Sequence, residues 1–449
     1  MKEISSLYQL FRTPYGFVPA RDKFLTAVRE KLDGGKEPFA GIYSLDHEKR
    51  KVTEILAGGR AALLVGNYGS GKTELAKSIL GLLNDYYAKH PSYCISDCPV
   101  QEDPSGVAFY LGLNKRRNFI EPCPICRKRH LGRGADPRKI PVRRVSRLSE
   151  GGGFARIQSG SDVMPEEIIG SYNIIKLARI GDPFDPEVFQ PGKICQANGG
   201  LLFVDEIGKL SESGQYALLQ AVQEGIVTPS KSRETFSVDI LLVATSNPED
   251  EEEIRGAVAD RLVSVSIPFA DRENEIKIVR KELDKYGKGV YFPALYAGLI
   301  VDIVRLVRQK GKAGVTQRAG INAAAVARSS ALLEKRRVVT YCDAREGIFT
   351  AILGCSKLED MEDTEKLLRK EFPQARDYIG GIFPDLDMAG PPSETGGKGG
   401  TRGGRGKHRN NRALSEALLA SEGPVSTELL DALVKDIADA CGRGCSAAG

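Results

Sequence analysis

The sequence contains no apolar run of the roughly 18 residues that a membrane-spanning helix needs. Its opening stretch, MKEISSLYQLFRTPYGF, lacks the uninterrupted apolar segment of a secretory signal. A strong charge bias is absent as well, because 64 Lys and Arg against 59 Asp and Glu leave a formal net charge of +5 over 449 residues. We therefore expect a soluble cytoplasmic protein without a membrane span, and the overall charge does not favour a nucleic-acid binder.

Hydrophobic residues make up 41% of the chain and charged residues 27%, which is typical of globular proteins. Short apolar runs alternate with helical stretches at 41–270, as in an α/β domain built on a largely parallel sheet. The expected strands are Ala61–Val65, Leu201–Val204, Asp239–Ala244 and Leu262–Phe269. The sequence thus predicts an αβα parallel-sheet core at 41–270, with an N-terminal arm at 1–40 and a cysteine-rich, basic insertion at 94–148.

Beyond the core, apolar residues recur at helical spacing and predict a helical domain at 271–355. One example of this spacing is Leu295, Leu299, Ile303 and Leu306. Thr340 followed by Asp343 is a candidate capping box for a helix. The remaining predicted segments are a helical extension at 356–390, a Gly/Arg-rich linker at 391–412 and a small helical C-terminal segment at 413–449.

A glycine-rich loop follows the apolar strand AALLV and precedes an apolar-periodic helix. Its residues are Gly66, Asn67, Tyr68, Gly69, Ser70, Gly71, Lys72 and Thr73. The pattern matches GxxxxGK[ST], in which glycines let backbone N–H groups surround phosphates at a helix N-terminus. Lys72 can reach the β- and γ-phosphates and Thr73 can bind Mg²⁺. We interpret the loop as an ATP and Mg²⁺ site; the alternative is an accidental Gly-rich turn between strand and helix.

Polar residues end the next two apolar strands. Asp205 and Glu206 follow LLFV, where an aspartate can hold the Mg²⁺ ion and a glutamate can act as general base toward the attacking water. Asn247 follows the strand ILLVA and can orient that water. Taken alone, the segment is better explained as a turn-initiating Ser-Asn-Pro, but the order of Asn247 after the other two motifs favours the nucleotide site.

Taken together, these motifs resemble the AAA+ ATPases, and among them the ATPase (I) subunit of magnesium chelatase. The resemblance covers roughly two thirds of the chain. Its segments are GSYNIIKLARIGDPFDPEVFQPGKICQANGGLLFVDEIGKL, LLQAVQEGIVTPS, ATSNPED, AVADRL and GVTQRAGINAAAVAR. The stretch PGKICQANGGLLFVDEI is also similar to archaeal Lon-type proteases, and ISDCPVQEDP, CPIC and IPVRRV are similar to PrkA-type AAA domains.

The resemblance implies two further site residues. Arg261 matches an arginine finger, which acts on nucleotide held by a neighbouring subunit, and Arg318 matches the sensor 2 arginine of the lid. A finger acting in trans implies a head-to-tail ring of identical subunits, typically a hexamer in this family. The alternatives are a surface arginine before a strand for Arg261 and a solvated helix N-terminus for Arg318.

Residues 154–199 resemble the helix-2 insertion, which in such rings projects toward the pore or the partner. Its apolar residues could bury a hairpin edge or touch a substrate, and the sequence leaves both open. These residues are Ile168, Ile169, Ile174 and Ile175.

The basic insertion contains a candidate structural zinc site formed by Cys94, Cys98, Cys123 and Cys126. His130 is an alternative fourth ligand, and buried thiols packed as small hydrophobic groups are the alternative to any metal. The insertion and the Gly/Arg-rich linker carry many basic but few aromatic residues, so nucleic-acid binding is disfavoured.

The favoured hypothesis is a ring-forming ATPase of the chelatase I type that remodels a partner protein, with an adhesion-type (VWA) module as one candidate for the client. A PrkA-like serine protein kinase and a nucleic-acid-associated AAA+ motor are the alternatives. No Gly-rich kinase loop and no HRD-like catalytic loop is present in the sequence, which disfavours the kinase.

Overall fold

The computed structural model describes residues 4–160, 162–229, 234–285, 289–310, 314–356 and 361–371. These residues fall into two compact units, one ending at Pro268 and the next beginning at Phe269. The predicted linker at 391–412 and the predicted C-terminal segment at 413–449 lie outside the described residues.

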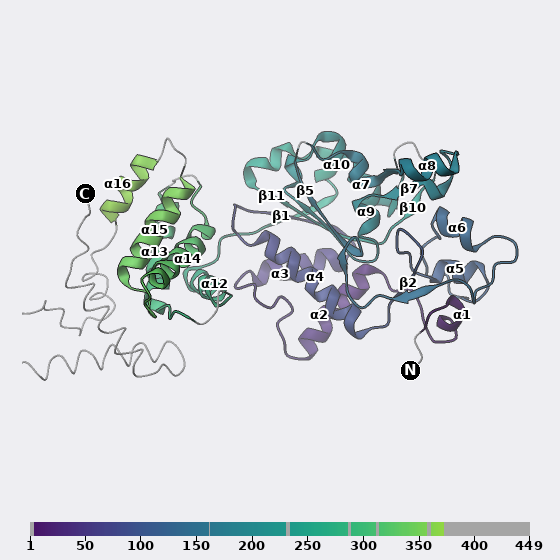
Figure 1. Cartoon of the computed structure of the whole chain (residues 1–449), viewed down its shortest axis with the longest axis horizontal. Coiled ribbons are helices and arrows are strands. Elements are labelled where there is room, and N and C mark those ends of the chain that lie inside the picture. Colours follow the sequence, from purple (N-terminus) through teal and green to yellow (C-terminus); the bar gives the residue numbers. More distant parts are fainter. Residues whose placement is uncertain are drawn as a thin grey trace, which may run out of the picture. The chain divides into compact units, whose positions relative to one another are not determined.

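The first unit is built on a six-stranded sheet with the strand order β12-β1-β11-β8-β5-β4, in which every neighbouring pair is parallel (Figure 1). The strands are β1 (Ala61–Val65), β4 (Ser149–Glu150), β5 (Gly153–Gln158), β8 (Leu201–Asp205), β11 (Leu241–Ser246) and β12 (Leu262–Ser266). The predicted parallel α/β core is therefore confirmed, and four of its strands lie where apolar runs predicted them.

Helices cover both faces of this sheet, and alternate strand residues contribute to two separate cores. Leu64 packs with α2 (Ala20–Asp33), α3 (Asp46–Ala57) and α4 (Lys72–Lys89), whereas Leu63 packs with α7, α9 and α10. The helices of this second layer are α7 (Pro165–Ile169), α9 (Lys193–Gln196) and α10 (Glu212–Glu224). Since both faces are covered, β1 is buried along its whole length, which explains its continuous apolar sequence.

Strand β11 begins two residues later than predicted. Asp239 lies before it and accepts a hydrogen bond from the N–H of Ala20 at 2.7 Å. Its carboxylate therefore satisfies a free backbone donor at the start of α2 instead of joining the strand.

The predicted insertion is folded onto the first unit. The antiparallel pair β2 (Tyr93–Ile95) and β3 (Val142–Arg144) brackets it, with α5 (Ser105–Tyr110) and α6 (Pro124–His130) in between. The N-terminal arm includes α1 (Leu7–Leu10), and the Leu7 N–H donates to the carbonyl of Ile140 at 3.0 Å.

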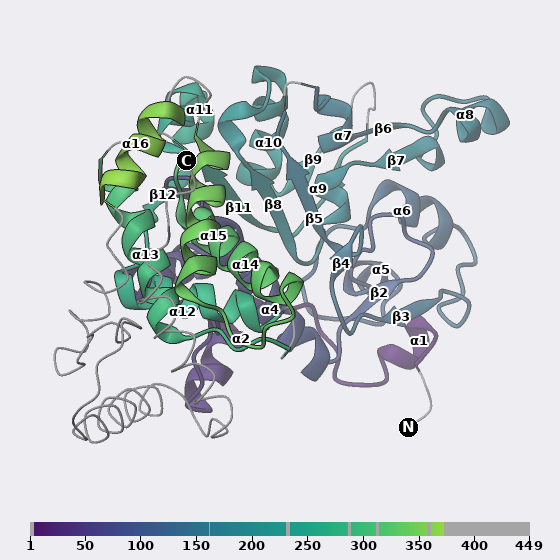
Figure 2. The ribbon, with the colours of Figure 1, turned by 60° about the vertical axis from the view of Figure 1, so that its left-hand side comes forward.

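A second excursion projects from the core (Figure 2). It contains β6 (Gly170–Tyr172), α8 (Ile174–Ile180), η1 (Pro186–Val188) and β7 (Phe189–Pro191), and β6 and β7 pair antiparallel. The first residues of the segment at 154–199 belong to the core strand β5 instead of the excursion. Of the four isoleucines, Ile168 is buried and Ile169 packs against the core, whereas Ile174 and Ile175 are 80% and 67% exposed.

The smaller elements of the first unit lie around the sheet. They are β9 (Ile226–Val227) paired antiparallel with β10 (Phe236–Ser237), η2 (Ile207–Lys209), η3 (Pro248–Glu253) and α11 (Gly256–Ala259).

The second unit is helical, as predicted. Its helices are α12 (Arg272–Asp284), α13 (Ala294–Gln309), α14 (Gln317–Leu333), α15 (Tyr341–Cys355) and α16 (Met361–Glu371). Helices α14 and α15 approach closely, because a Cβ on Gly347 would lie 2.3 Å from the carbonyl oxygen of Ala323. The predicted capping box of Thr340 and Asp343 is confirmed at the start of α15.

Asp343 is a buried polar anchor of this unit. Its carboxylate is 3% exposed and accepts hydrogen bonds from the Thr340 N–H and the Ser330 hydroxyl, each at 2.8 Å, and from the Arg336 guanidinium. Burial opposes ionisation, but the hydrogen bonds from Arg336, Thr340 and Ser330 outweigh it and lower the pKa of Asp343.

We expect Asp343→Ala to destabilise the second unit by about 3–5 kcal/mol, because it removes the cap of α15 and the buried partner of Arg336, which keeps an ion pair with the exposed Glu334. Hydrogen exchange in α14 and α15 should accelerate accordingly. The pKa of Asp343 is lower in the folded protein than in the unfolded chain. The difference in stability between the wild type and Asp343→Ala should therefore be fully present above the ordinary aspartate pKa of about 3.9, and it should disappear as the pH falls through the pKa of the folded protein. Asp302→Ala, at an exposed ion pair with Arg272, is the matched control and should cost less than about 1 kcal/mol. Equal effects of the two substitutions would contradict this role.

Candidate functional site

The glycine-rich loop connects the end of β1 to the start of α4. Gly69 and Gly71 have φ angles of +79° and +94°, in the left-handed region that glycine adopts without strain. A Cβ on Gly66 would lie 2.4 Å from the carbonyl oxygen of Ile267. These glycines are therefore required by the backbone path, which leads into the N-terminus of an 18-residue helix.

Lys72 lies within this loop and is 8% exposed. Its ammonium group donates to the carbonyl of Gly66, to that of Asn67 at 3.0 Å and to Oδ1 of Asn247 at 3.1 Å. Asn247 is 2% exposed, and its Nδ2 donates to Asp250 at 3.0 Å, which fixes the amide with its oxygen toward Lys72. Two residues 175 positions apart in the sequence thus meet at the carboxyl ends of β1 and β11.

A threonine that the sequence analysis missed joins the two acidic residues. The hydroxyl of Thr245 donates to Oδ1 of Asp205 at 2.8 Å and accepts from the Glu206 N–H at 2.9 Å. Thr245 is fully buried at the end of β11, beside β8. In the sequence, only its position two residues before Asn247 indicated a place at this site. Its contact with Asp205 could not be predicted, because that contact depends on the order of the strands in the sheet.

Arg156 of β5 is a second residue that sequence reasoning missed. Its guanidinium forms an ion pair with Oδ2 of Asp205 and lies 5.6 Å from the ring centre of Phe203. Arg156 therefore balances the charge of the predicted Mg²⁺-binding carboxylate, and a divalent cation at Asp205 would compete with it.

Glu206 has a φ angle of +57°, which is uncommon for a residue other than glycine. Its carboxylate accepts from the Lys209 ammonium at 2.9 Å, and Lys209 also donates to the Tyr68 hydroxyl at 3.0 Å. The hydrogen bond to Glu206, with a smaller contribution from that to Tyr68, raises the pKa of Lys209. Lys209 thus links the acidic strand end to the glycine-rich loop.

The remaining predicted nucleotide residues occupy separate places. Thr73 follows Lys72 in the first turn of α4. Arg261 lies between α11 and β12, and its guanidinium donates to the carbonyl of Ala257 at 2.6 Å. Arg318 lies in the first turn of α14 in the second unit, where its N–H donates to the Thr316 hydroxyl at 3.2 Å. The roles of Arg261 and Arg318 remain predictions.

The predicted cysteine ligands come together only in part. Cys98, Cys123 and Cys126 lie with Glu102 in one buried group. Cys94 is not in that group, because it lies on strand β2 opposite Arg143, and burial raises the pKa of its thiol to about 12. His130 is also elsewhere, with its Nε2 3.2 Å from Asp97. The fourth residue of the group is therefore Glu102 and not Cys94. The spacing of the cysteines could not indicate a glutamate.

Comparison with known families settles the relationship. The PrkA AAA domain matches residues 51–287, which is more than half of the chain and includes the glycine-rich loop and both acidic strand-end residues. The chain belongs to the PrkA AAA domain family. The AAA+ resemblance of the sequence is therefore confirmed, together with its AAA+ fold. Among the described helices of this PrkA AAA domain, none is long and apolar enough to cross a membrane.

Known relatives align with parts of this chain. The magnesium-chelatase 67 kDa subunit of Heliobacterium mobile is 25% identical over 55% of this chain and 33% of its own length. The hydrogenase transcriptional regulatory protein HoxA of Cupriavidus necator is 32% identical over 24% of each chain. The chain thus spans about a quarter to a third of these relatives.

Solved structures with a similar arrangement have low TM-scores. The complex between BchI and BchD of magnesium chelatase gives 0.34, at 18% identity over 78% of this chain and 97% of that chain. RuvB of Thermotoga maritima, the Holliday junction branch migration motor, gives 0.36, at 14% identity over 88% and 86% of the two chains.

Proposed function

We propose that this protein is an AAA+ ATP hydrolase that acts in a homo-oligomeric ring, a hexamer in the simplest case, and remodels a partner protein. The observation that carries the proposal is the contact between Lys72 and Asn247 beside the Asp205–Thr245–Glu206 network. A lysine, an amide and two carboxylates at the ends of three adjacent parallel strands form the polar edge at which ATP would be cleaved.

Each residue has a proposed chemical role. When ATP binds, the ammonium of Lys72 leaves the carbonyls of Gly66 and Asn67 and donates to the β- and γ-phosphate oxygens instead. The hydroxyl of Thr73 and the carboxylate of Asp205 are hard oxygen donors that suit Mg²⁺, which would offset the charge of the phosphates. Glu206 accepts a proton from the attacking water as its oxygen bonds to the γ-phosphorus and the bond to the ADP oxygen breaks. Asn247 orients that water.

The ring is proposed from Arg261, which would reach the nucleotide of the neighbouring subunit, and from Arg318 as the sensor of the helical unit. The excursion at 170–191, here called the projecting hairpin, supports the remodelling part of the proposal. Its tip exposes four large apolar side chains, an arrangement that suits contact with a client protein. These side chains are Ile174, Ile175, Ile180 and Phe184. A client with an adhesion-type module is the first candidate to test.

The central test is Lys72→Ala. We expect this substitution to weaken ATP binding and to abolish steady phosphate release measured without any protein acceptor, because the loop loses the ammonium that meets the phosphates. Lys77→Ala, an exposed lysine of the same helix whose ammonium pairs with Glu74, is the matched control and should retain full activity. Wild-type turnover in Lys72→Ala would exclude this site as the ATPase centre.

A serine protein kinase is the second candidate, and the family match favours it. The two functions differ in the acceptor of the γ-phosphate. With γ-labelled ATP, a hydrolase yields labelled inorganic phosphate in the absence of protein substrate, whereas a kinase transfers the label to serine hydroxyls of casein or of a native protein. Label on protein, lost in Lys72→Ala, would replace the hydrolase proposal.

A further inference from the structure

The four-residue group of the insertion has the dimensions of a metal site. One ligand atom from each of Cys98, Glu102, Cys123 and Cys126 lies within 4.8 Å of the other three. The sulfurs of Cys98 and Cys123 are 3.8 Å apart, far longer than the roughly 2.05 Å of a disulfide. A tetrahedral Zn²⁺ with Zn–S bonds of about 2.3 Å requires sulfur–sulfur separations of about 3.8 Å.

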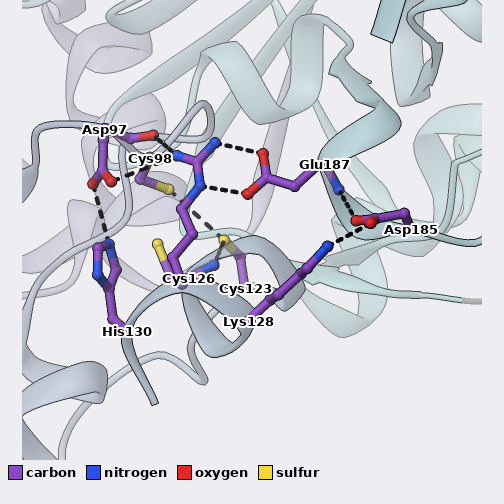
Figure 3. A network of polar contacts seen from close by, with 9 residues as sticks. Asp97, Cys98, Cys123, Cys126, Lys128, His130, Asp185 and Glu187 are labelled. Carbon is purple, nitrogen blue, oxygen red and sulfur yellow. Dashed lines mark hydrogen bonds and ion pairs between the residues drawn. The ribbon is translucent and has the colours of Figure 1, made fainter. Parts of the chain in front are cut away.

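The backbone around the cysteines is shaped for thiolates. Cys123 precedes α6, and its sulfur accepts the N–H of Cys126 at 3.4 Å, which folds the Cys-Pro-Ile-Cys segment into a tight turn. The sulfur of Cys98 lies in a second turn, where the Cys98 N–H donates to the carbonyl of Ile95 at 3.3 Å. Figure 3 shows these three sulfurs gathered between the two turns.

Glu102 gives an independent indication of a cation. Its side chain is 4% exposed, and Oε2 accepts the Cys123 N–H at 2.7 Å. The other oxygen, Oε1, is buried and has no hydrogen-bond partner in the part of the chain that the structure describes. No lysine or arginine among the described residues forms an ion pair with Glu102. In its ionised form, a buried carboxylate with an unsatisfied oxygen beside three thiols is unfavourable unless a cation binds it.

We propose that Cys98, Glu102, Cys123 and Cys126 bind one structural Zn²⁺. Three sulfurs and one carboxylate oxygen fill a tetrahedral zinc sphere and leave no position open for a substrate. Binding deprotonates the three thiols, and their protons pass to solvent as three Zn–S bonds form, with no change of oxidation state.

This ion would hold the base of the projecting hairpin. Helix α6 carries Cys126 and, two and three residues later, Lys128 and Arg129. Arg129 pairs with Glu187 of the η1 turn, which precedes β7, through two hydrogen bonds. Lys128 pairs with Asp185 at the start of the same turn (Figure 3). Zn²⁺ would join α6 to the turn that contains Cys98. It would thereby hold in place Lys128 and Arg129, the two basic side chains that bind the hairpin.

Metal analysis of the purified full-length protein tests the site. We expect about one zinc per chain in the wild type and in Cys94→Ser, and a loss of most zinc in Cys98→Ser and Cys123→Ser. Cys195→Ala is the matched control, because Cys195 is a buried thiol outside the group. A folded wild type that neither contains zinc nor takes it up on dialysis would overturn the proposal, as would equal loss in Cys94→Ser.

Two measurements do not depend on the folding of cysteine variants. Zinc X-ray absorption on the wild type should give three sulfurs at about 2.3 Å and one oxygen at about 2.0–2.2 Å; four sulfurs, or a nitrogen ligand, would refute this ligand set. Glu102→Gln should hold zinc at least tenfold more weakly against a competing chelator, and unchanged affinity would refute Glu102 as a ligand.

The mechanical role has its own readout. Removal of zinc from the wild type by a chelator should accelerate hydrogen exchange at least tenfold across residues 186–191, at the hairpin base. Exchange in α15 of the second unit is the internal reference and should not change. Unaltered exchange at 186–191 in zinc-free protein would show that the metal does not anchor the hairpin.

Discussion

Glu206→Gln is expected to lower steady ATP turnover by about 10²–10⁴-fold while ATP binding stays within a few-fold of the wild type. Glutamine has the same shape, and its amide oxygen can still accept from Lys209, which donates to Glu206 at 2.9 Å. It cannot take a proton from the attacking water. Turnover measured by phosphate release and binding measured by calorimetry separate the two effects.

Glu212→Gln is the control for this prediction. Glu212 belongs to the same unit, lies in the first turn of α10 and has a side chain that is 54% exposed beside Arg255. Its substitution should leave turnover unchanged. If Glu206→Gln kept wild-type turnover, another group would have to be the general base, and the proposed chemistry of this strand end would be wrong.

Arg261→Ala is expected to reduce turnover by about 10³-fold or more with little change in ATP binding, because an arginine finger stabilises charge mainly in the transition state. The structure leaves Arg261 available for this role, since its side chain is 30% exposed. Among the described residues it contacts the carbonyl of Ala257 and the side chains of Asp260 and Gln223. Arg255→Ala is the control; Arg255 is a nearby exposed arginine paired with Glu212.

Mixing variants tests whether Arg261 acts in trans. Glu206→Gln and Arg261→Ala should each turn over ATP only slowly on their own. A mixture of the two should regain activity, because an intact Glu206 site then meets an intact Arg261 from its neighbour. No recovery in mixed assemblies, or a protein that sediments as a monomer with and without nucleotide, would contradict the ring.

Local signals in the sequence were sufficient for much of the fold. The glycine-rich loop, the strands β1 and β8 and the capping box at Thr340 each depend on residues close together in the chain, and each lies where it was predicted. Strand β5 was missed because its burial alternates along GFARIQ, so it has no continuous apolar run, unlike its neighbour β8.

The contacts that sequence reasoning missed are long-range. Arg156 meets Asp205 from a strand 49 residues earlier, and Thr245 meets it from a strand 40 residues later. Both contacts follow from strand order, which no short motif specifies. Glu102 was missed for another reason: cysteine spacing identifies thiols, whereas one carboxylate among 59 acidic residues has no pattern of its own.

The left-handed backbone of Glu206 has a consequence for stability. With φ at +57°, any residue that has a Cβ costs about 1–2 kcal/mol there relative to its preferred conformation. Glu206→Gly should therefore be more stable than Glu206→Ala by about 1 kcal/mol, although both lose the carboxylate. The surrounding contacts, and not the intrinsic preference of the residue, hold the backbone of Glu206 in this conformation, at the point where we propose that water is activated.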